Sequence, residues 1–365
     1  MRILFLFIGE THHLLHSLPI AAELQELSPQ TDICIAVPGA EYLPIIERLT
    51  SAYPLFRPEP VLLKRGIGRR RHRSRLLTLF QNLRFLRSFD AIVVPERTTT
   101  IIRHFLGRNT RLIFTPHGAG DRAIMLDPRD RFFDFVLVAG NKSEQRLLEA
   151  GTITPGHYCV NGYVKMDFMK RIAKTGPRLF DNDRPVVVYT PHFRTELSSW
   201  PRFGRELIGA FSRQERYNLV VAPHMRLFHG ASQAARDEIL SLAVPGKILI
   251  DLDSPRLTDM TYTMGADIYV GDVSSQVYEF LLEPRPCIFL DAHDTDWRDN
   301  PDYRFWTLGD VASDVVDLMR AIDRAPERHS QYRNLQIEAF ADSVGGDPSG
   351  AAERGARAIL EYLDK

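Results

Sequence analysis

Two histidines follow short apolar runs in the sequence, where each is placed for proton transfer. His117 comes after the run 112–115 and precedes Gly118. His224 comes after the run 219–222. An imidazole titrates near neutral pH, and a glycine beside it lets the backbone turn sharply and approach a ligand. Either histidine alone could be structural, bonded to a local carbonyl, but two at matched positions favour catalysis.

Hydroxyl, carboxyl and guanidinium groups after other apolar runs suit a nucleotide diphosphate. Ser274 and Ser275 stand where a helix is expected to begin, so free N–H groups and two hydroxyls would face phosphate oxygens. Glu279 would share a helical face with Ser275 and accept from ribose hydroxyls. The alternative is a serine N-cap and a solvated glutamate. Arg194 would neutralise the diphosphate, unless it is an ordinary surface arginine. The residues assigned to the donor are Thr190, Arg194, Asp272, Ser274, Ser275 and Glu279.

The histidines near the start of the chain are not read as a metal site. His12, His13 and His16 have no nearby pair of carboxylates to complete a defined site. The polar stretch 293–299 is interpreted as a loop, because an Asn-Pro pair follows it. We therefore expect no metal and no other cofactor. The residues assigned to the acceptor side are Gly9, His12, His13 and Gly118.

The segment 64–87 is the sharpest charge feature of the chain. It carries repeated Lys and Arg residues and no Asp or Glu, with Leu and Phe interleaved. A basic stretch joined to an amphipathic helix is what anionic membranes attract. The alternatives are a core-packed helix with a solvated basic flank and a nucleic-acid site, which the neutral remainder of the chain disfavours. The residues assigned to membrane contact are Arg69, Arg70, Arg71, Arg73, Arg75 and Phe80.

The elements that must position these residues form a repeating pattern. Short runs rich in Val and Ile alternate with longer helical patterns, which is typical of β-α-β units around parallel sheets. The expected strands are 3–8, 33–37, 61–63, 91–94, 112–115, 135–138 and 158–160, then 186–190, 219–222, 248–252, 268–270 and 287–290. A polar break at 170–184 separates the two sets. Ligands of open α/β sheets bind at the carboxyl ends of strands, where the residues above lie.

We therefore predict two doubly wound, Rossmann-like domains, 1–175 on the acceptor side and 176–345 for the donor, with a C-terminal helix at 346–365. The 365 residues carry 46 Lys and Arg against 46 Asp and Glu, and this neutrality argues against a disordered tail or a nucleic-acid coat. Three scattered cysteines support neither a disulfide framework nor a zinc ribbon. The apolar start 3–8 is too short for a membrane helix and is not followed by a cleavage site. These features predict a cytoplasmic protein.

Taken together, the loops resemble those of the CDP-glycerol glycerophosphotransferases of teichoic acid synthesis, within the two-domain GT-B group. The resemblance rests on His117-Gly118, on 162–167, which is similar to a Gly-x-Pro-Arg-x-Asp signature, and on 189–194, 223–224 and 272–275. It implies a GT-B-like fold with two facing domains and an inter-domain cleft. By resemblance, His117 and His224 match the two important histidines of the family. Arg194, Ser274 and Ser275 match contacts to the donor phosphates.

The expected function is transfer of a polyol phosphate from a CDP-linked donor to a hydroxyl of a glycan or lipid-linked acceptor in cell-envelope polymer synthesis. His117 would be the general base, and the donor residues would stabilise the leaving phosphate without metal. The alternatives are a nucleotide-sugar glycosyltransferase of GT-B type, a nucleotide-sugar 2-epimerase and a non-catalytic nucleotide-binding module. The expected location is cytoplasmic and peripheral on the inner face of the cell membrane, with no nucleic-acid partner.

Overall fold

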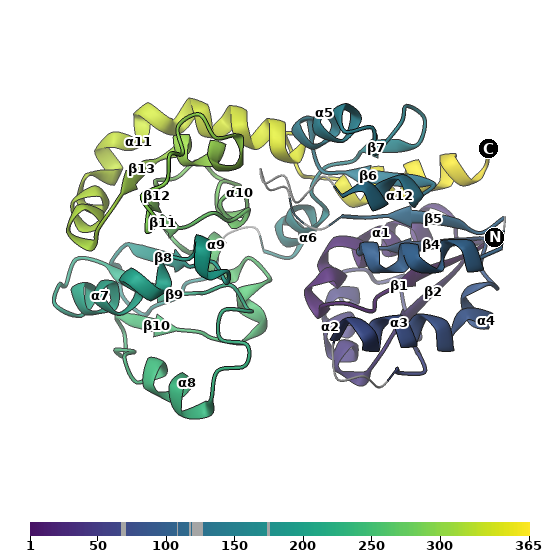
Figure 1. Ribbon diagram of the computed structural model, residues 1–365, viewed down its shortest axis with the longest axis horizontal. Coiled ribbons are helices and arrows are strands. Elements are labelled where there is room, and N and C mark those ends of the chain that lie inside the picture. Colours follow the sequence, from purple (N-terminus) through teal and green to yellow (C-terminus); the bar gives the residue numbers. More distant parts are fainter. Residues whose placement is uncertain (67–70, 108, 117, 119–126, 174–175) are drawn as a thin grey trace. The chain divides into compact units, whose positions relative to one another are not determined.

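The computed structural model describes residues 1–66, 71–107, 109–116, 118, 127–173 and 176–365, with only the backbone of 71–73 (Figure 1). The chain divides into two units. Unit 1 contains the described residues up to 172 together with 341–365, and unit 2 runs from 173 to 340. Residues 341–365 therefore return to the first unit, a connection of which the sequence pattern gave no sign.

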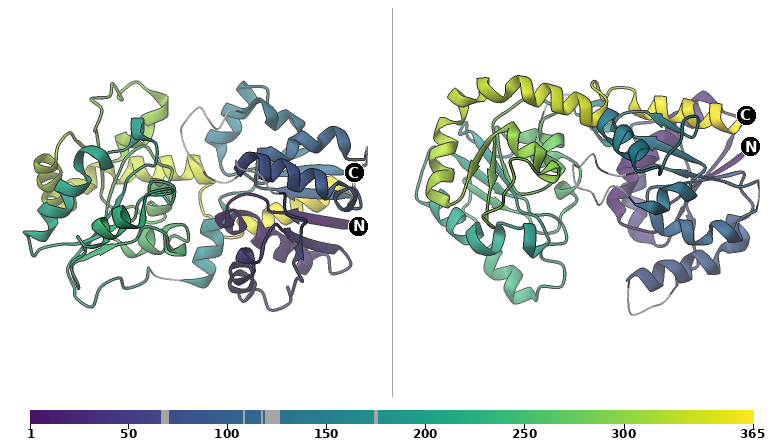
Figure 2. Two further views of the ribbon diagram at one scale, coloured as in Figure 1. Left: turned by 60° about the horizontal axis from the view of Figure 1, so that its bottom comes forward. Right: turned by 45° about the horizontal axis from the view of Figure 1, so that its top comes forward.

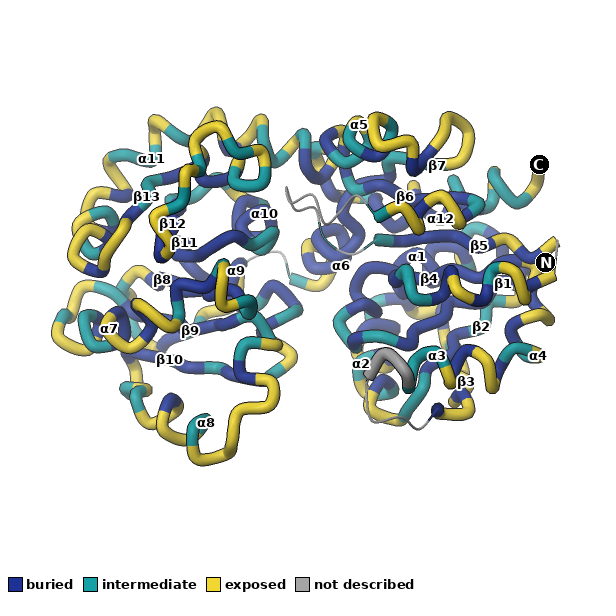
Figure 3. Tube along the Cα trace, viewed as in Figure 1, coloured by how far each residue is buried: buried dark blue, intermediate teal, exposed yellow. Residues whose placement is uncertain are grey.

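Unit 1 is built on a parallel sheet of seven strands in the order β3-β2-β1-β4-β5-β6-β7. The strands are β1 (Arg2–Leu6), β2 (Asp32–Val37), β3 (Val61–Leu62), β4 (Ala91–Val94), β5 (Arg111–Phe114), β6 (Phe135–Val138) and β7 (Tyr158–Val160). The central strands are buried on both faces, which explains why they read as unbroken apolar runs instead of alternating patterns (Figure 3).

Unit 2 is built on a parallel sheet of six strands in the order β10-β9-β8-β11-β12-β13. The strands are β8 (Val186–Thr190), β9 (Asn218–Val221), β10 (Ile248–Ile250), β11 (Ile268–Gly271), β12 (Cys287–Leu290) and β13 (Asp310–Ala312). Two parallel-sheet α/β domains are thus confirmed. The sequence did not predict β13, because a three-residue edge strand that begins with Asp carries almost no hydrophobic pattern.

Helices cover the sheet in each unit (Figures 1 and 2). In unit 1 these are α1 (Leu14–Leu27), α2 (Leu43–Thr50), α3 (Arg71–Gln81), α4 (Leu83–Leu86), α5 (Asn141–Glu149), α6 (Val164–Ile172) and α12 (Ala351–Leu363). The 3-10 helices in the described part of unit 1 are η1 (Thr11–His13), η2 (Ala40–Tyr42), η3 (Arg97–Phe105) and η5 (Pro128–Phe132). Helix α1 contacts α2, α6 and α12, and α3 contacts η3.

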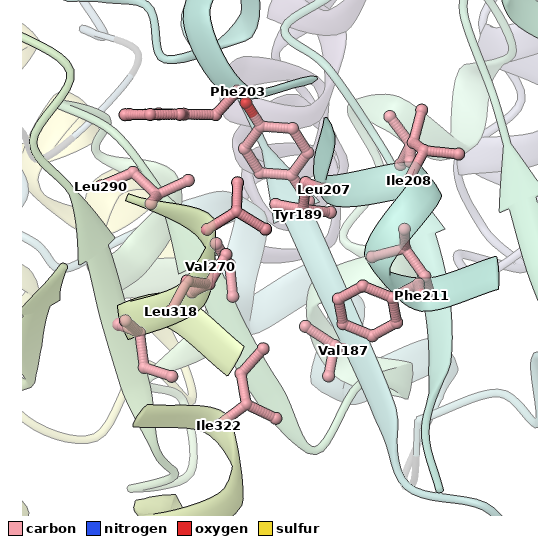
Figure 4. Close-up of a cluster of buried hydrophobic side chains, with 14 of the residues drawn as sticks. Val187, Tyr189, Phe203, Leu207, Ile208, Phe211, Val270, Leu290, Leu318 and Ile322 are labelled. Atoms are coloured by element: carbon pink, nitrogen blue, oxygen red, sulfur yellow. The ribbon is translucent and has the colours of Figure 1, made fainter. Parts of the chain in front are cut away.

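The helices of unit 2 are α7 (Trp200–Ser212), α8 (Gln233–Leu240), α9 (Thr261–Gly265), α10 (Gln276–Phe280) and α11 (Val315–Val344), with η6 (Thr195–Leu197), η7 (Pro255–Leu257) and η8 (Pro301–Leu308). Helix α7 shows how sequence spacing builds the core. Its Phe203, Leu207 and Phe211 recur every four residues, so they share one face. That face packs on Val187 and Tyr189 of β8 (Figure 4).

The order of the strands fixes where ligands can bind. In unit 1 the order reverses between β1 and β4, and in unit 2 it reverses between β8 and β11. Crossovers on either side of such a point leave in opposite directions, which opens a crevice at the carboxyl ends of the two strands. The loops after β1, β4, β8 and β11 are therefore the ones placed to meet ligands.

The C-terminal helix α12 is fastened to unit 1 by a capping carboxylate. Asp167 Oδ1 accepts the N–H of Gly350 at 2.9 Å, and Oδ2 accepts the N–H of Ala352 at 2.9 Å. These N–H groups have no partner within a helix, and a carboxylate there also opposes the helix dipole. Arg354 donates from Nε to the carbonyl oxygen of Asn161 at 2.9 Å. The segment 162–167 thus secures the return of the chain to unit 1.

Within the described parts of the chain, none of the helices combines the length and the apolar character needed to traverse a bilayer.

We predict that Asp167→Ala lowers the free energy of unfolding by about 1 to 3 kcal/mol, because the part-buried N–H of Gly350 and the buried N–H of Ala352 lose a charged acceptor. Urea denaturation of the full chain measures this change. Asp364→Ala is the matched control, since Asp364 is exposed and lies just beyond the last turn of the same helix. Equal stabilities of the two variants would contradict a capping role for Asp167.

Candidate active site

A buried carboxylate organises the switch point of unit 2. Asp272 follows β11 and is 0% exposed. Its Oδ2 accepts the N–H of His192 at 2.8 Å and the N–H of Ser199 at 2.9 Å. Asp272 Oδ1 has no hydrogen-bond partner among the described residues. Asp272 thus ties the loop after β8 and the start of α7 to β11, a supporting role that the sequence did not predict.

Burial sets the acidity of this carboxylate. Removal from water raises the pKa of Asp272 to about 7, while hydrogen bonds from Ser199 and His192 act in the opposite direction. Ionising a fully buried carboxylate is costly, because the hydrogen bonds from two backbone N–H groups offset only part of the free energy lost when the charge leaves water.

Two loops with the same sequence pattern meet in unit 2. Pro191-His192-Phe193-Arg194 follows β8, and Pro223-His224-Met225-Arg226 follows the neighbouring strand β9. In each loop the backbone N–H of the arginine donates to Nδ1 of the histidine, at 3.0 Å for Arg194 and 3.2 Å for Arg226. Because Nδ1 accepts, the neutral ring carries its hydrogen on Nε2. The two imidazoles are therefore oriented alike by their own loops.

Phe193 is the centre around which these side chains gather. Its ring centroid lies 4.6 Å from that of His192 and 4.5 Å from that of His224, and the two imidazole centroids are 6.0 Å apart. The guanidinium carbons of Arg194 and Arg226 lie 5.8 and 5.5 Å from the Phe193 centroid. Two imidazoles and two guanidinium groups are thus collected on one aromatic ring, and such a set of donors suits an anion.

The sequence singled out Arg194 and His224 but not His192 or Arg226. The signal was present, since Pro-His-x-Arg occurs twice at the ends of adjacent expected strands. That the two copies share one phenylalanine depends on the parallel pairing of β8 with β9.

The remaining donor-side residues are placed as follows. Thr190 is buried, and its hydroxyl donates to the hydroxyl of Tyr269 at 2.8 Å. Ser274 Oγ accepts the N–H of Gln276 at 3.3 Å. Ser275 stands before α10, which has five residues, and makes no side-chain cap. Glu279 lies in α10 and is buried. Ser274 and Ser275 share the β11–α10 loop with Asp272.

On the acceptor side, Gly9, His12 and His13 follow β1, and Gly118 follows β5. His13 is buried, its Nδ1 is 4.0 Å from Oε1 of Glu96, and its ring lies 4.6 Å from that of His12. Gly118 has φ 99°, a conformation that favours glycine. His117 lies outside the described residues. No group of three or more His, Cys, Asp or Glu side chains is arranged to hold a metal ion within the ranges described above.

The basic segment divides between two environments. Arg69 and Arg70 lie outside the described residues, and only the backbones of Arg71 and Arg73 are described, as part of α3. Phe80 is 42% exposed. The side chain of Arg75 is only 19% exposed and forms ion pairs with Glu10 and Glu96. The side chain of Arg75 therefore points inward, so we do not propose that Arg75 contacts a membrane.

Residues 115–360, about two thirds of the chain, match the family described as CDP-Glycerol:Poly(glycerophosphate) glycerophosphotransferase. The chain belongs to this glycerophosphotransferase family. The resemblance inferred from the loops is confirmed, and the protein is a transferase. No curated protein matches its sequence.

Several solved structures are similar to this glycerophosphotransferase-family chain. A variant of the wall teichoic acid polymerase TagF soaked with CDPG is 16% identical, covers 100% of this chain and 88% of its own, and has a TM-score of 0.64. S. aureus MnaA with UDP is 14% identical, with 100% and 97% covered and a TM-score of 0.68. The UDP-GlcNAc 2-epimerase from Neisseria meningitidis bound to UDP-GlcNAc is 12% identical, with 100% and 99% covered and a TM-score of 0.62. At such identities these likenesses establish the fold.

We predict a pH-dependent contribution of Asp272 to stability. The folded pKa lies above the value near 3.9 of an unfolded Asp. The contribution of Asp272 to the free energy of unfolding is therefore fully present below pH 4. It decreases as the pH rises from 4 and is lost above about pH 7. Between pH 5 and 8 the unfolding free energy of the unaltered protein should fall by about 2 to 3 kcal/mol more than that of Asp272→Asn, since each pH unit up to 7 corresponds to about 1.4 kcal/mol. Urea denaturation at both pH values tests this, and an equal fall in both proteins would remove Asp272 as the cause.

Proposed function

We propose that this transferase moves a polyol phosphate, with glycerol phosphate favoured, from a CDP-linked donor to a hydroxyl of a glycan or lipid-linked acceptor in cell-envelope polymer synthesis. Unit 2 would bind the donor and unit 1 the acceptor. The observation that carries the proposal is the cluster of two imidazoles and two guanidinium groups around Phe193, at the sheet edge where ligands bind. TagF with CDPG, a protein of the same fold, supports the choice of donor.

The chemistry follows from the charges that change. The acceptor oxygen attacks the phosphorus that bears the polyol, a new P–O bond forms, and the bond to the bridging oxygen breaks, so that CMP leaves with an additional negative charge. Arg194, Arg226 and His224 would stabilise that charge as fixed donors. Ser274 and Ser275 would add hydroxyls to the same phosphates.

The proton of the acceptor hydroxyl needs a base, and we assign that role to His117. This residue follows β5, next to β4 in the sheet of unit 1. A base removes the proton while the P–O bond forms. Gly9, His12, His13 and Gly118 would complete the acceptor side. A divalent ion has no role in this scheme, because the arginines supply the positive charge.

The surface around α3 supports a peripheral membrane site on the inner face of the cell membrane. The rings of Phe80 and Phe105 meet edge to face with centroids 5.4 Å apart, and both side chains are exposed, as is Leu77. Apolar side chains beside the arginines of segment 64–87 suit an anionic lipid surface, which attracts each nearby basic residue by about 1 kcal/mol. We keep Arg69, Arg70, Arg71, Arg73 and Phe80 in this proposal.

The reaction is tested by following nucleotide release from CDP-glycerol and from UDP-N-acetylglucosamine, with and without a glycan acceptor. We expect acceptor-dependent release of CMP, unchanged by a chelator. Loss of the general base in His117→Ala should slow CMP release by about 10²- to 10⁴-fold, while the affinity for the donor should stay unchanged. Release of CDP or UDP would indicate a glycosyltransferase, and conversion of the sugar without net release would indicate a 2-epimerase. Binding without any turnover would indicate a non-catalytic module.

Donor affinity should depend on the arginines that flank Phe193. Arg194→Gln and Arg226→Gln should each weaken CDP-glycerol binding about tenfold or more, because hydrogen bonds between charged groups are typically worth about 1.5 to 3 kcal/mol. Calorimetric titration measures the dissociation constants. Arg213→Gln, an exposed arginine just after α7, is the matched control. Unchanged affinity in both test variants would exclude this cluster as the phosphate site.

Membrane attachment should be electrostatic and reversible. In cosedimentation with vesicles, the protein should bind anionic lipid at low salt and detach at about 1 M salt, where the screening length shrinks to about 3 Å. Reversing the charges of Arg70, Arg71 and Arg73 should release it at low salt. Neutral vesicles are the control for the lipid. Failure of the unaltered protein to bind anionic vesicles would end the membrane proposal.

A further inference from the structure

Unit 1 contains an open cavity of about 480 Å³ beside the amino ends of β5 and β6. One wall is the end of η3 and the turn that follows it, with Arg103, His104 and Leu106. The other wall is the end of η5 and the residues before β6, with Arg131 and Phe132. Substrates of an open parallel sheet bind at its opposite edge, outside the carboxyl ends of the strands. The cavity is therefore separate from the site proposed for the reaction.

The charged groups of this cavity favour an anion. Among the described residues that line it, Asp134 carries the one carboxylate. Asp134 Oδ1 accepts from Nη2 of Arg103 at 2.8 Å and lies 3.9 Å from Nη1 of Arg111. Arg131 is exposed and makes no ion pair within the described part of the chain. Two arginines thus balance the single carboxylate, and the guanidinium of Arg131 adds a further positive charge at the surface.

Exposed apolar side chains continue from the cavity across the neighbouring helices. Phe132 on η5 and Phe105 on η3 are 39% and 44% exposed. The ring of Phe132 lies 6.4 Å from that of His104, and the ring of Phe105 lies 5.4 Å from that of Phe80 on α3. Ile101 precedes His104 by three residues, one turn of a 3-10 helix, and is also exposed. Exposed apolar residues gathered in this way indicate a surface that meets a membrane or another macromolecule.

Buried neighbours make these aromatic side chains point outward. Leu106 and Phe133 belong to the hydrophobic core of unit 1, and each has an extended backbone. They directly follow Phe105 and Phe132, and successive side chains of extended backbone point to opposite sides. Arg87 also donates from Nε to the carbonyl oxygen of Phe105 at 2.5 Å, which fastens the end of η3. The two exposed rings are thus presented by anchored backbone.

Cations beside exposed apolar side chains fit a ligand that has a phosphate at one end and hydrocarbon at the other. A guanidinium group binds phosphate through parallel N–H donors, and an imidazole supplies a donor in each of its protonation states. A nucleic acid also carries phosphates, but its bases stack on aromatic rings. The aliphatic side chains of Ile101 and Leu77, exposed on the same surface, offer no ring for stacking. The surface therefore favours a lipid.

We propose that this cavity binds the phosphate of an anionic phospholipid of a bilayer, through Arg131 and His104, while Phe105 and Phe132 enter the hydrocarbon. The proposal rests on the proposed function in one respect, since it requires the protein to lie at a membrane. The basic segment 64–87 would supply a general attraction to negative charge. The cavity would add a contact with one headgroup at a defined place on unit 1.

Ligand-detected NMR on the full chain tests the site, with dihexanoyl phosphatidylglycerol below its micelle concentration as the anionic lipid probe. Dihexanoyl phosphatidylcholine is the zwitterionic probe with the same chains, and inorganic phosphate is the anion without chains. We expect the phosphatidylglycerol probe to bind most tightly. The double variant Arg131→Gln with His104→Gln should raise its dissociation constant about tenfold, because hydrogen bonds to a charged phosphate are lost. Arg213→Gln, at an exposed arginine of unit 2, is the matched control.

A second double variant tests the apolar part of the site. Phe105→Ser with Phe132→Ser should reduce cosedimentation with phosphatidylcholine vesicles that contain phosphatidylglycerol, because two rings no longer enter the hydrocarbon. Leu335→Ser is the matched control, since Leu335 is an exposed apolar residue of α11 in unit 2. Charge reversal at Arg70, Arg71 and Arg73 should weaken vesicle binding and leave the affinity for the soluble phosphatidylglycerol probe unchanged.

Equal affinity of the phosphatidylglycerol probe for the unaltered protein and for the Arg131 and His104 double variant would overturn the proposal. Inorganic phosphate bound as tightly as that probe would also overturn it, since the site would then hold an anion without regard to lipid. Tighter binding of a single-stranded oligonucleotide, lost in the same double variant, would make the surface a nucleic-acid site.

The CMP-release assay with a soluble glycan acceptor is read separately. Both double variants should release CMP at the unaltered rate, because their side chains lie outside the proposed catalytic site. If release fails in the unaltered protein while the Arg131 and His104 double variant loses probe binding, the proposed reaction is wrong and the cavity assignment stands. If release depends on acceptor while probe binding is the same in this variant, only the cavity assignment is wrong.

Discussion

Parallel strands cannot be joined by tight turns, and this constraint governs both units. Each strand must be followed by a crossover before the next parallel strand begins, so the carboxyl ends of all strands in a sheet fall along one edge. The strand order reverses between β1 and β4 and between β8 and β11. At those two points the loops diverge, and there the structure places its buried charges and its paired histidines. The order of the strands therefore fixes the edge of each sheet at which ligand-binding side chains can gather.

The two switch points hold their carboxylates in different ways. In unit 2, burial raises the pKa of Asp272 to about 7, although backbone N–H groups of His192 and Ser199 donate to its carboxylate and act in the opposite direction. In unit 1, Glu10 and Glu96 share the guanidinium of Arg75. A carboxylate held by N–H groups in a dry interior serves as a structural tie.

The fold alone does not decide the reaction. Chains with this fold include the polymerase TagF and UDP-GlcNAc 2-epimerases, which carry out different chemistry on the same framework. Membership of the glycerophosphotransferase family makes the protein a transferase. The side chains narrow the proposed reaction, because the guanidinium and imidazole groups gathered on Phe193 suit an anion such as a phosphate.

The sequence by itself determined the sheets and the chemically important loops. Strands buried on both faces must be apolar throughout, so the bounds of β4, β6, β8 and β12 could be predicted to the residue. Loops at strand ends must reach ligands, so the loops that carry Arg194, His224 and Asp272 were found from spacing. Of the strands that the structure describes, β13 was not predicted, because this short edge strand buries too little to need an apolar run.

Tertiary structure decided which of those residues meet and which way they point. Arg75 belongs to a basic segment in sequence, yet its side chain points to the buried carboxylates of Glu10 and Glu96, which lie in the loops after β1 and β4, 65 and 21 residues away. His192 joins His224 only because β8 pairs with β9. Asp167 caps a helix 183 residues later in the chain. The local pattern of residue types indicates which positions are buried and where the chain turns. Contacts between distant segments arise from packing, and a single sequence gives no direct indication of them.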